Sequence, residues 1–129
     1  MNMKRKIITL GESGNIIMPS NITDIWMSEP ELVGLIGITA PALCAAVRAI
    51  YKSGALKEYE VQKYIRLENG YHADVFSLTM IVALAFRINS FGAEQVRNTV
   101  FERLYLRKEK TSIFFSLGIN GRNTSNYQA

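Results

Sequence analysis

The sequence is poor in cysteine and histidine, with one of each, Cys44 and His72. A single cysteine cannot form a disulfide within the chain, although extracellular domains of this size often contain several. One cysteine and one histidine also cannot supply the set of ligands that a structural zinc site takes from these residue types. We therefore expect a cytoplasmic protein, in a reducing compartment, that holds no metal.

Long apolar runs are also missing. The longest, at residues 78–86, is far shorter than the roughly 20 residues needed to cross a bilayer. Residues 7–18 contain Thr, Gly, Glu, Ser and Asn where a secretion signal would be apolar. The sequence predicts neither a membrane partner nor secretion.

Motifs of catalysis and cofactor binding are absent as well. No glycine-rich phosphate loop follows a strand-like segment, and no pair of acidic residues stands in a recognisable catalytic motif. Cys44 and His72 could be imagined as a nucleophile and its base, but a lone cysteine in an alanine-rich segment is typical of packing. We expect a protein that is not an enzyme and needs no cofactor.

The composition that remains is that of a folded chain. Hydrophobic residues make up 48% of the sequence and charged residues 20%, which is far from the composition of disordered proteins. We expect one domain at residues 1–117, followed by a flexible tail at residues 118–129, which is rich in Gly, Asn, Ser and Thr. The formal net charge of +4 weakly favours a polyanionic partner.

Two short helices separated by a glycine are the clearest local pattern. Ser28 and Glu31 have the spacing of a capping box, at the start of a helix that Gly37 ends. Thr39 can cap a second helix that continues to Gly54. The apolar residues of this second helix recur at helical spacing: Leu43, Val47 and Ile50. The pattern predicts a helix-turn-helix.

Two β-hairpins are expected on either side of this pair. Residues 6–10 and 15–18 flank a glycine-containing turn near the N-terminus. Residues 59–67 and 71–76 flank an Asn-Gly pair, the strongest short signal for a hairpin. Trp26, just ahead of the first helix, is expected to pack against the core.

Two further helices follow. Ser77 is expected to cap a mostly apolar helix that ends near residues 89–90, and a long amphipathic helix is expected from residue 93 to about residue 110. In that last helix the inward-facing residues are expected to be Val96, Val100 and Leu104. Arg87 is expected to satisfy carbonyls or a carboxylate within the fold, or else to bind an anion. Together these elements predict an α+β fold with a helix-turn-helix, winged-helix-like core, β-hairpins and two C-terminal helices.

Several short segments resemble the RhuM-type virulence-protein family of bacteria. They are residues 25–28 (IWMS), 35–38 (LIGI), 50–56 (IYKSGAL), 74–78 (DVFSL), 83–90 (ALAFRINS) and 95–97 (QVR). The resemblance covers roughly residues 16–105. It implies a protein of bacterial or mobile-element origin, with an accessory or regulatory role that includes DNA binding through the helix-turn-helix.

The second helix has few side chains that could contact bases, and this leaves two hypotheses open. If double-stranded DNA is the partner, the candidate contacts on the second helix and near the hairpin are Thr39, Arg48, Lys52, Lys57, Lys63 and Arg66. In the alternative, the helix is a surface for a second copy or another protein, lined by Ala40, Cys44 and Ala45. The sequence does not decide between these partners.

Overall fold

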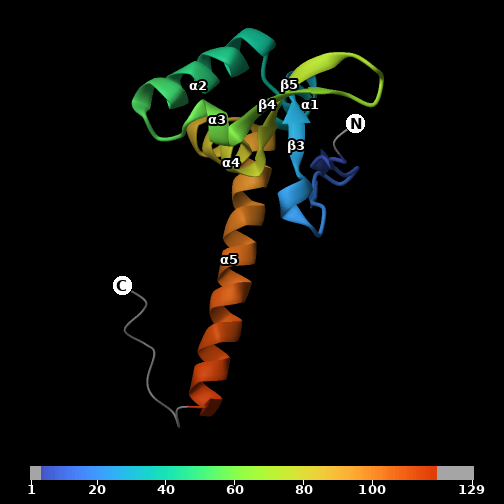
Figure 1. Cartoon of the computed structure of the whole chain (residues 1–129). Coiled ribbons are helices and arrows are strands. Elements are labelled where there is room, and N and C mark those ends of the chain that lie inside the picture. Colours follow the sequence, from blue (N-terminus) through green and yellow to red (C-terminus); the bar gives the residue numbers. More distant parts are fainter. Residues whose placement is uncertain (1–3, 119–129) are drawn as a thin grey trace. The chain divides into compact units, whose positions relative to one another are not determined.

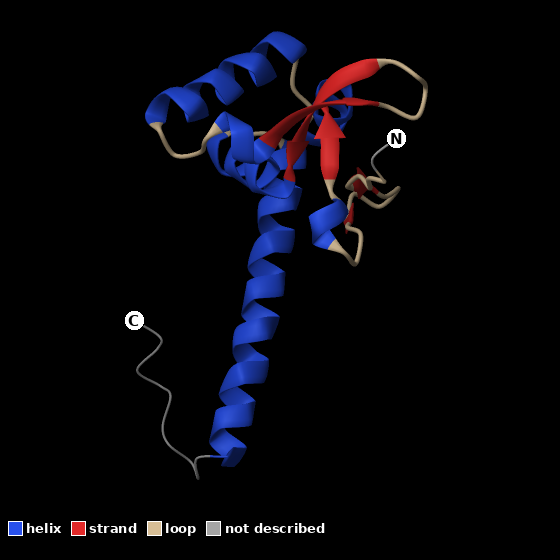
Figure 2. Cartoon of the chain, viewed as in Figure 1, coloured by secondary structure: helices blue, strands red, loops and turns tan. Residues whose placement is uncertain are grey.

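The computed structural model describes residues 4–118, with the side chains of residues 4–105. This part of the chain has a mixed α+β fold, with five α-helices and two small antiparallel sheets (Figures 1 and 2). The predicted fold class is confirmed at this level. The chain divides into two compact units, Met1–Arg97 and Asn98–Ala129.

The N-terminal hairpin is present in a shorter form than predicted. Strands β1, Thr9–Leu10, and β2, Ile16–Ile17, pair antiparallel. The turn between them contains Gly14, whose φ of +86° lies in the left-handed region that glycine adopts at no steric cost. A short 3-10 helix, Ile22–Asp24, follows.

A strand that the sequence analysis did not predict lies directly ahead of the first α-helix. This strand, β3, spans Trp26–Ser28 and pairs antiparallel with β5, His72–Ser77, with Trp26 opposite Ser77. β5 also pairs with β4, Gln62–Arg66, so that the sheet order is β3-β5-β4 (Figure 2). Three residues are too few to show the alternation that predicts a strand. The strand forms because it pairs with residues about fifty positions later in the chain, and a local pattern does not reveal such a partner.

Helix α1, Glu29–Ile36, begins and ends as its sequence predicts. The backbone N–H of Ser28 donates to Oε1 of Glu31 at 2.8 Å, which is half of the predicted capping box. Gly37 follows the helix with a φ of +80°. A left-handed glycine ends a helix because its backbone can turn there without a Cβ clash.

Helix α2, Ala40–Ser53, starts after a turn of three residues. Oγ1 of Thr39 accepts a hydrogen bond from the N–H of Ala42 at 3.3 Å, as the predicted cap requires. Gly54 ends the helix with a φ of +82°. The axes of α1 and α2 differ in direction by 103°, and Leu43, Val47 and Ile50 of α2 are buried as predicted.

The second hairpin is confirmed, but its first strand starts later than predicted. Residues 59–61 belong to a short helix, α3, Glu58–Val61, and β4 begins only at Gln62. Acidic residues in the first turn of α3 are favourable at the positive end of a helix. The alternation of polar and apolar residues in this segment had indicated a strand instead. The turn between β4 and β5 contains Gly70 with a φ of +92°.

Helix α4, Leu78–Arg87, begins after Ser77, which is its N-cap residue as expected. The side chain of Ser77 makes no capping hydrogen bond. Its Oγ is buried without a hydrogen-bond partner among the described atoms. The position of the cap is therefore confirmed, but its side-chain hydrogen bond is absent.

Helix α5, Phe91–Gly118, starts earlier and ends later than predicted. Ser90 caps it, since its Oγ accepts from the N–H of Ala93 at 3.1 Å while donating to the carbonyl of Ile36 at 2.6 Å. The predicted inward face is correct for Val96, which is fully buried, but wrong for Leu104, which is 57% exposed. Residues 119–129, most of the predicted tail, lie outside the described residues.

The core of the first unit is formed by side chains from the N-terminal segment, β3, β5 and helices α1, α2, α4 and α5. Its fully buried large side chains are Ile8, Ile25, Met27, Leu32, Ile36, Leu43, Val75, Met80, Ile81, Leu84 and Val96. Nη1 of Arg97 donates to the carbonyls of Ala85 and Ile88, at 2.6 and 2.9 Å. The role expected for Arg87 thus belongs to Arg97, and Arg87 itself is exposed.

Candidate functional site

Helix α2 presents a mixed surface on the side away from its buried residues. Of the candidate DNA contacts, Thr39, Arg48 and Lys52 are exposed. Of the candidate interface residues, Ala45 is exposed, whereas Ala40 and Cys44 are half-buried. Cys44 therefore does not lie on the fully exposed side of the helix where the sequence placed it.

The basic residues near the hairpin do not share one face of the sheet. Lys57, Lys63 and Arg66 are all exposed. Side chains alternate along a strand, and Nζ of Lys63 lies 4.4 Å from the ring centre of Trp26 on β3. Arg66 lies on the opposite face, the one that Tyr64 shares with its stacked neighbour His72. Only one of the two strand cations can therefore face the same side as α2.

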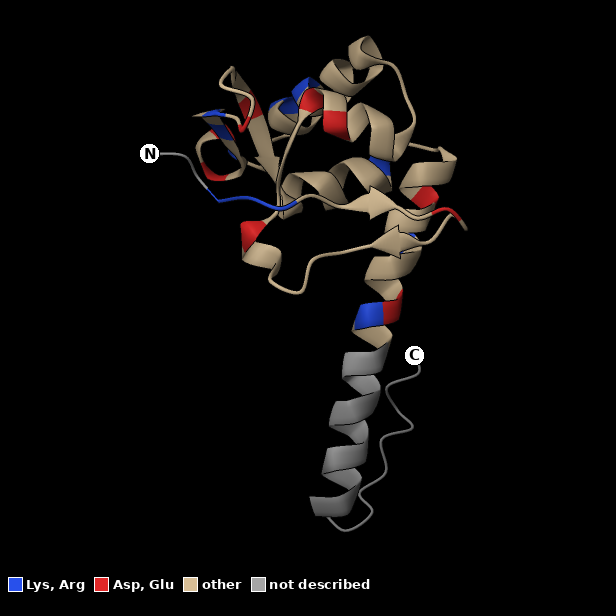
Figure 3. Cartoon of the chain, turned by 90° about the vertical axis from the view of Figure 1, so that its right-hand side faces the viewer, with Lys and Arg blue, Asp and Glu red and all other residues tan. Residues whose placement is uncertain are grey.

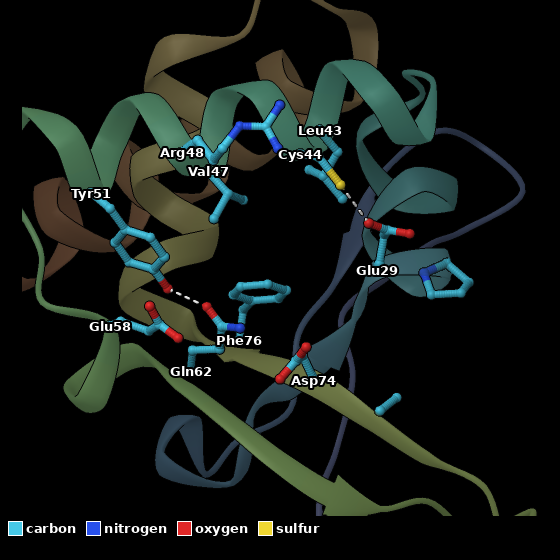
Figure 4. Close-up of a pocket in the computed structure, with 12 residues that line it drawn as sticks. Glu29, Leu43, Cys44, Val47, Arg48, Tyr51, Glu58, Gln62, Asp74 and Phe76 are labelled. Atoms are coloured by element: carbon cyan, nitrogen blue, oxygen red, sulfur yellow. Dashed lines mark hydrogen bonds between the residues drawn. The ribbon is translucent and has the colours of Figure 1, made fainter.

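A cavity of about 470 Å³ lies between α2 and the β4–β5 hairpin (Figure 4). Its apolar part is formed by Leu43 and Val47 of α2 and by Phe76 of β5, all of which are buried. Arg48 also lines it. The structure thus places one of the candidate DNA contacts beside a cavity that the sequence did not indicate.

Three carboxylates line the same cavity: Glu29 at the start of α1, Glu58 at the start of α3, and Asp74 in β5. Sequence reasoning missed them, because they stand far apart in the chain and belong to no common motif. Figure 4 shows Glu29 at one end, Glu58 at the other and Asp74 between them. With Arg48 as the one Lys or Arg among the lining residues, acidic groups exceed basic ones.

Cys44 forms a hydrogen bond with one of these carboxylates. Its Sγ donates to Oε2 of Glu29 at 2.8 Å (Figure 4). This hydrogen bond, burial and the negative charge of Glu29 raise the pKa of the Cys44 thiol, and Arg48 opposes them less strongly. Because the thiolate is the nucleophilic form, Cys44 is a poor nucleophile at neutral pH. His72 is stacked on Tyr64 and is not among the residues that line the cavity.

Tyr51 marks the opposite end of the cavity. Its hydroxyl donates to Oε1 of Gln62 at 2.6 Å (Figure 4). Burial raises the pKa of Tyr51 to about 12, and the negative charges of Glu58 and Asp74 contribute. The Tyr51 hydroxyl therefore stays neutral at neutral pH, and its raised pKa reflects burial first and the nearby carboxylates second.

Arg5 holds the N-terminal segment against α1 and the hairpin. Its guanidinium forms ion pairs with Glu31 at 2.7 Å and with Glu68 at 3.0 Å, and Nη1 also donates to the carbonyl of Trp26 at 2.9 Å. The side chain of Arg5 is only 5% exposed. No sequence pattern indicated this role, since Arg5 lies in a basic N-terminal stretch that is typical of a solvated end.

The residues with described side chains carry little net charge. Between residues 4 and 105, eleven Lys and Arg stand against ten Asp and Glu, so this part has a formal charge of +1 of the total of +4. In the view of Figure 3 the two signs are interspersed over the coloured residues. Residues 4–105 thus have little net positive charge with which to attract a polyanion.

Similarity to known proteins does not identify the site. No family model, no curated protein and no solved structure matches the chain. Among the described residues, no group of three or more His, Cys, Asp or Glu side chains is placed to hold a metal ion. In the same residues no single helix is long and apolar enough to cross a membrane, although α1 and α2 reach that length and hydropathy when taken together across their bend.

Proposed function

We propose that this chain binds double-stranded DNA through α2 and the β4–β5 hairpin, as an accessory or regulatory protein and not as an enzyme. The observation that carries the proposal is the order from β3 to β5, which is a strand, the helices α1 and α2, the short helix α3 and two further strands, with a sheet order of β3-β5-β4. An angle of 103° between α1 and α2 falls in the range of helix-turn-helix units, about 90–120°. These features support the proposal of a winged helix, in which the β4–β5 hairpin would be the wing.

The side chains of α2 favour contacts to phosphates over contacts to bases. Arg48 and Lys52 are one turn apart and both exposed, so they lie on one side of the helix. The exposed residues near its N-terminus include Pro41, Ala42 and Ala45, which have no hydrogen-bonding side chain. Sequence is read through hydrogen bonds to base edges. We therefore expect weak binding with little sequence preference.

The carboxylates of the cavity also limit the affinity. Glu58 and Asp74 are exposed and lie near Arg48 in the lining of one cavity. Negative charges beside a phosphate contact are unfavourable, and more so at low salt. Binding is accordingly expected to be weak, and added salt should weaken it further because each phosphate contact releases counterions.

The experiment is fluorescence anisotropy of a labelled random duplex across a salt series. In the double variant Arg48→Ala/Lys52→Ala we expect weaker binding at every salt concentration. The logarithm of its binding constant should also fall less steeply with the logarithm of the salt concentration, by about 0.9 for each phosphate that the variant no longer neutralises. Lys6→Ala/Arg87→Ala is the matched control, because it removes two exposed cations outside α2 and the hairpin. Equal binding by both variants, or no binding at low salt, would overturn the proposal.

A second candidate function is an interaction surface for a partner protein or a second copy. It is favoured by the small, exposed residues of α2, with Ala45 beside Pro41 and Ala42, and by the near-neutral charge of residues 4–105. Small side chains permit close approach of another helix. Ala45→Arg separates the candidates, since it should strengthen DNA binding and abolish association between protein chains. Membership of the RhuM-type family, with its bacterial origin, stays a prediction.

A further inference from the structure

The cavity between α2 and the hairpin combines an apolar floor with an acidic rim. The floor is formed by the buried side chains of Leu43, Val47 and Phe76. The rim contains Glu29 and Asp74, from α1 and β5. Its volume of about 470 Å³ lies within the range of small-molecule sites, about 300–1,000 Å³. The cavity therefore has the size and the lining of a ligand site.

Within residues 4–105, no Lys or Arg side chain forms an ion pair with the carboxylates of the rim. Among the described side chains, the Lys and Arg nitrogens that lie within 4.0 Å of a carboxylate oxygen belong to Arg5, which contacts neither Glu29, Glu58 nor Asp74. Arg48 lines the cavity without forming such a pair. Three carboxylates against one guanidinium leave an excess of two negative charges at neutral pH. That excess is the charge complement of a dication.

The hydrogen-bonding groups at the two ends of the cavity already have partners. Cys44 donates to Glu29 at one end, and Tyr51 donates to Gln62 at the other. Between these ends the phenyl ring of Phe76 and the side chain of Val47 offer only apolar contact. A ligand that fits must place an apolar body in the middle and its charged groups near the rim.

We propose that this cavity binds an organic dication with an aromatic, apolar body, of the aromatic diamidine class. The body would lie on Val47 and Phe76, where an aromatic ring also attracts nearby cationic groups. The charged groups would donate to Glu58, Asp74 and Glu29, and hydrogen bonds between charged partners are the strong ones. The same rim disfavours an anionic small molecule inside the cavity. A small inorganic cation would leave the apolar floor unused.

The test is a calorimetric titration of the full chain, without DNA, with pentamidine as the aromatic diamidine. We expect saturable binding of one molecule per chain. Glu58→Gln and Asp74→Asn should each weaken it about tenfold, since each removes one charged hydrogen-bond acceptor. Both residues are exposed, so both variants should keep their melting temperature. Glu60→Gln is the matched control, because Glu60 is exposed on the same short helix and does not line the cavity.

Two comparison ligands complete the test. Spermidine carries positive charge without an aromatic body, so we expect it to bind at least about tenfold more weakly than pentamidine. A lysine-rich peptide should likewise fail to displace the diamidine. The proposal is overturned by a lack of saturable binding, by equal affinity of Glu58→Gln and the native chain, by equal affinity for spermidine, or by displacement by the peptide. These titrations contain no DNA, so they stand apart from the test of DNA binding.

Discussion

Arg5 and Glu31 form a two-point ion pair between the N-terminal segment and α1. Nη1 of Arg5 lies 2.7 Å from Oε1 of Glu31, and Nη2 lies 3.0 Å from Oε2. The same Oε1 accepts the backbone N–H of Ser28. One carboxylate thus both caps α1 and holds residues twenty-six positions earlier in the chain.

Removal of Arg5 should destabilise the fold. In Arg5→Met we expect a loss of about 2–4 kcal/mol in the free energy of unfolding, because Glu31 is left partly buried without its cation. Urea denaturation measures this loss. Glu68→Gln breaks the other ion pair of Arg5, but Glu68 is 66% exposed, so we expect a loss below about 1 kcal/mol. Similar losses in the two variants would contradict this account.

The Arg5–Glu31 ion pair also predicts how the free energy of unfolding depends on pH. Burial alone would raise the pKa of Glu31, but hydrogen bonds from Arg5 and from Ser28 outweigh it and hold the pKa below the ordinary 4.5. The contribution of Glu31 to stability is therefore complete above pH 4.5 and is lost as the pH falls through the lowered pKa. In urea denaturation at decreasing pH, Arg5→Met should lose less stability than the native chain. An equal loss of stability in Arg5→Met and in the native chain as the pH falls would contradict this role of the Arg5–Glu31 pair.

Gly92, in the first turn of α5, lies against the end of α1. A Cβ at this position would clash with the carbonyl oxygen of Leu35 and would stand 2.8 Å from that of Ile36. Gly92→Ala should therefore cost about 2–3 kcal/mol. Gly34 is the matched control, since it is an exposed residue of α1 with nothing within 4 Å of its Cβ position. Gly34→Ala should stabilise the chain by about 0.5–1 kcal/mol. In thermal unfolding, the melting temperature should therefore fall for Gly92→Ala and rise for Gly34→Ala.

Tyr51 should ionise later than an ordinary tyrosine. With a pKa of about 12 in the fold against an ordinary 10.0, its neutral form is favoured by folding. Its contribution to stability is complete below about pH 10 and is lost as the pH rises towards 12. An ultraviolet titration of tyrosinate should show a late step that is absent in Tyr51→Phe. Tyr59→Phe removes a tyrosine that is 77% exposed, and the late step should remain.

Cys44 should react slowly with alkylating agents while Glu29 is intact. In Glu29→Gln the thiol loses the carboxylate that raises its pKa, so a larger fraction is thiolate. We expect alkylation by iodoacetamide near pH 8 to be about threefold to tenfold faster. Glu60→Gln should leave the rate unchanged. An unchanged rate in Glu29→Gln would show that access, and not the hydrogen bond, limits the reaction.

The parts of the fold that the sequence predicted are those set by neighbouring residues. Thr39 caps α2, Gly37 and Gly54 end helices, and Asn69-Gly70 turns the hairpin. Each of these depends on contacts within about four positions, so a local pattern is enough to reveal it. The candidate contacts on α2 came from the same kind of pattern, and their binding role stays a prediction.

The elements that the sequence missed are set by distant partners. β3 has three residues and gains its hydrogen bonds from β5. Leu104 fits an amphipathic pattern but remains exposed on α5. Whether a strand forms or an apolar side chain is buried depends in both cases on which part of the fold lies next to it. The helical or strand period of the sequence does not contain that information.

The sequence by itself determined the α1–α2 pair, because capping residues and glycines act within a single turn of the chain. Tertiary structure alone decided the candidate ligand site. Glu29, Glu58 and Asp74 meet around one cavity only because β5 lies in the sheet between β3 and β4 and the helix pair connects those two outer strands. Charges that are separate along the chain act together only after the strands have paired.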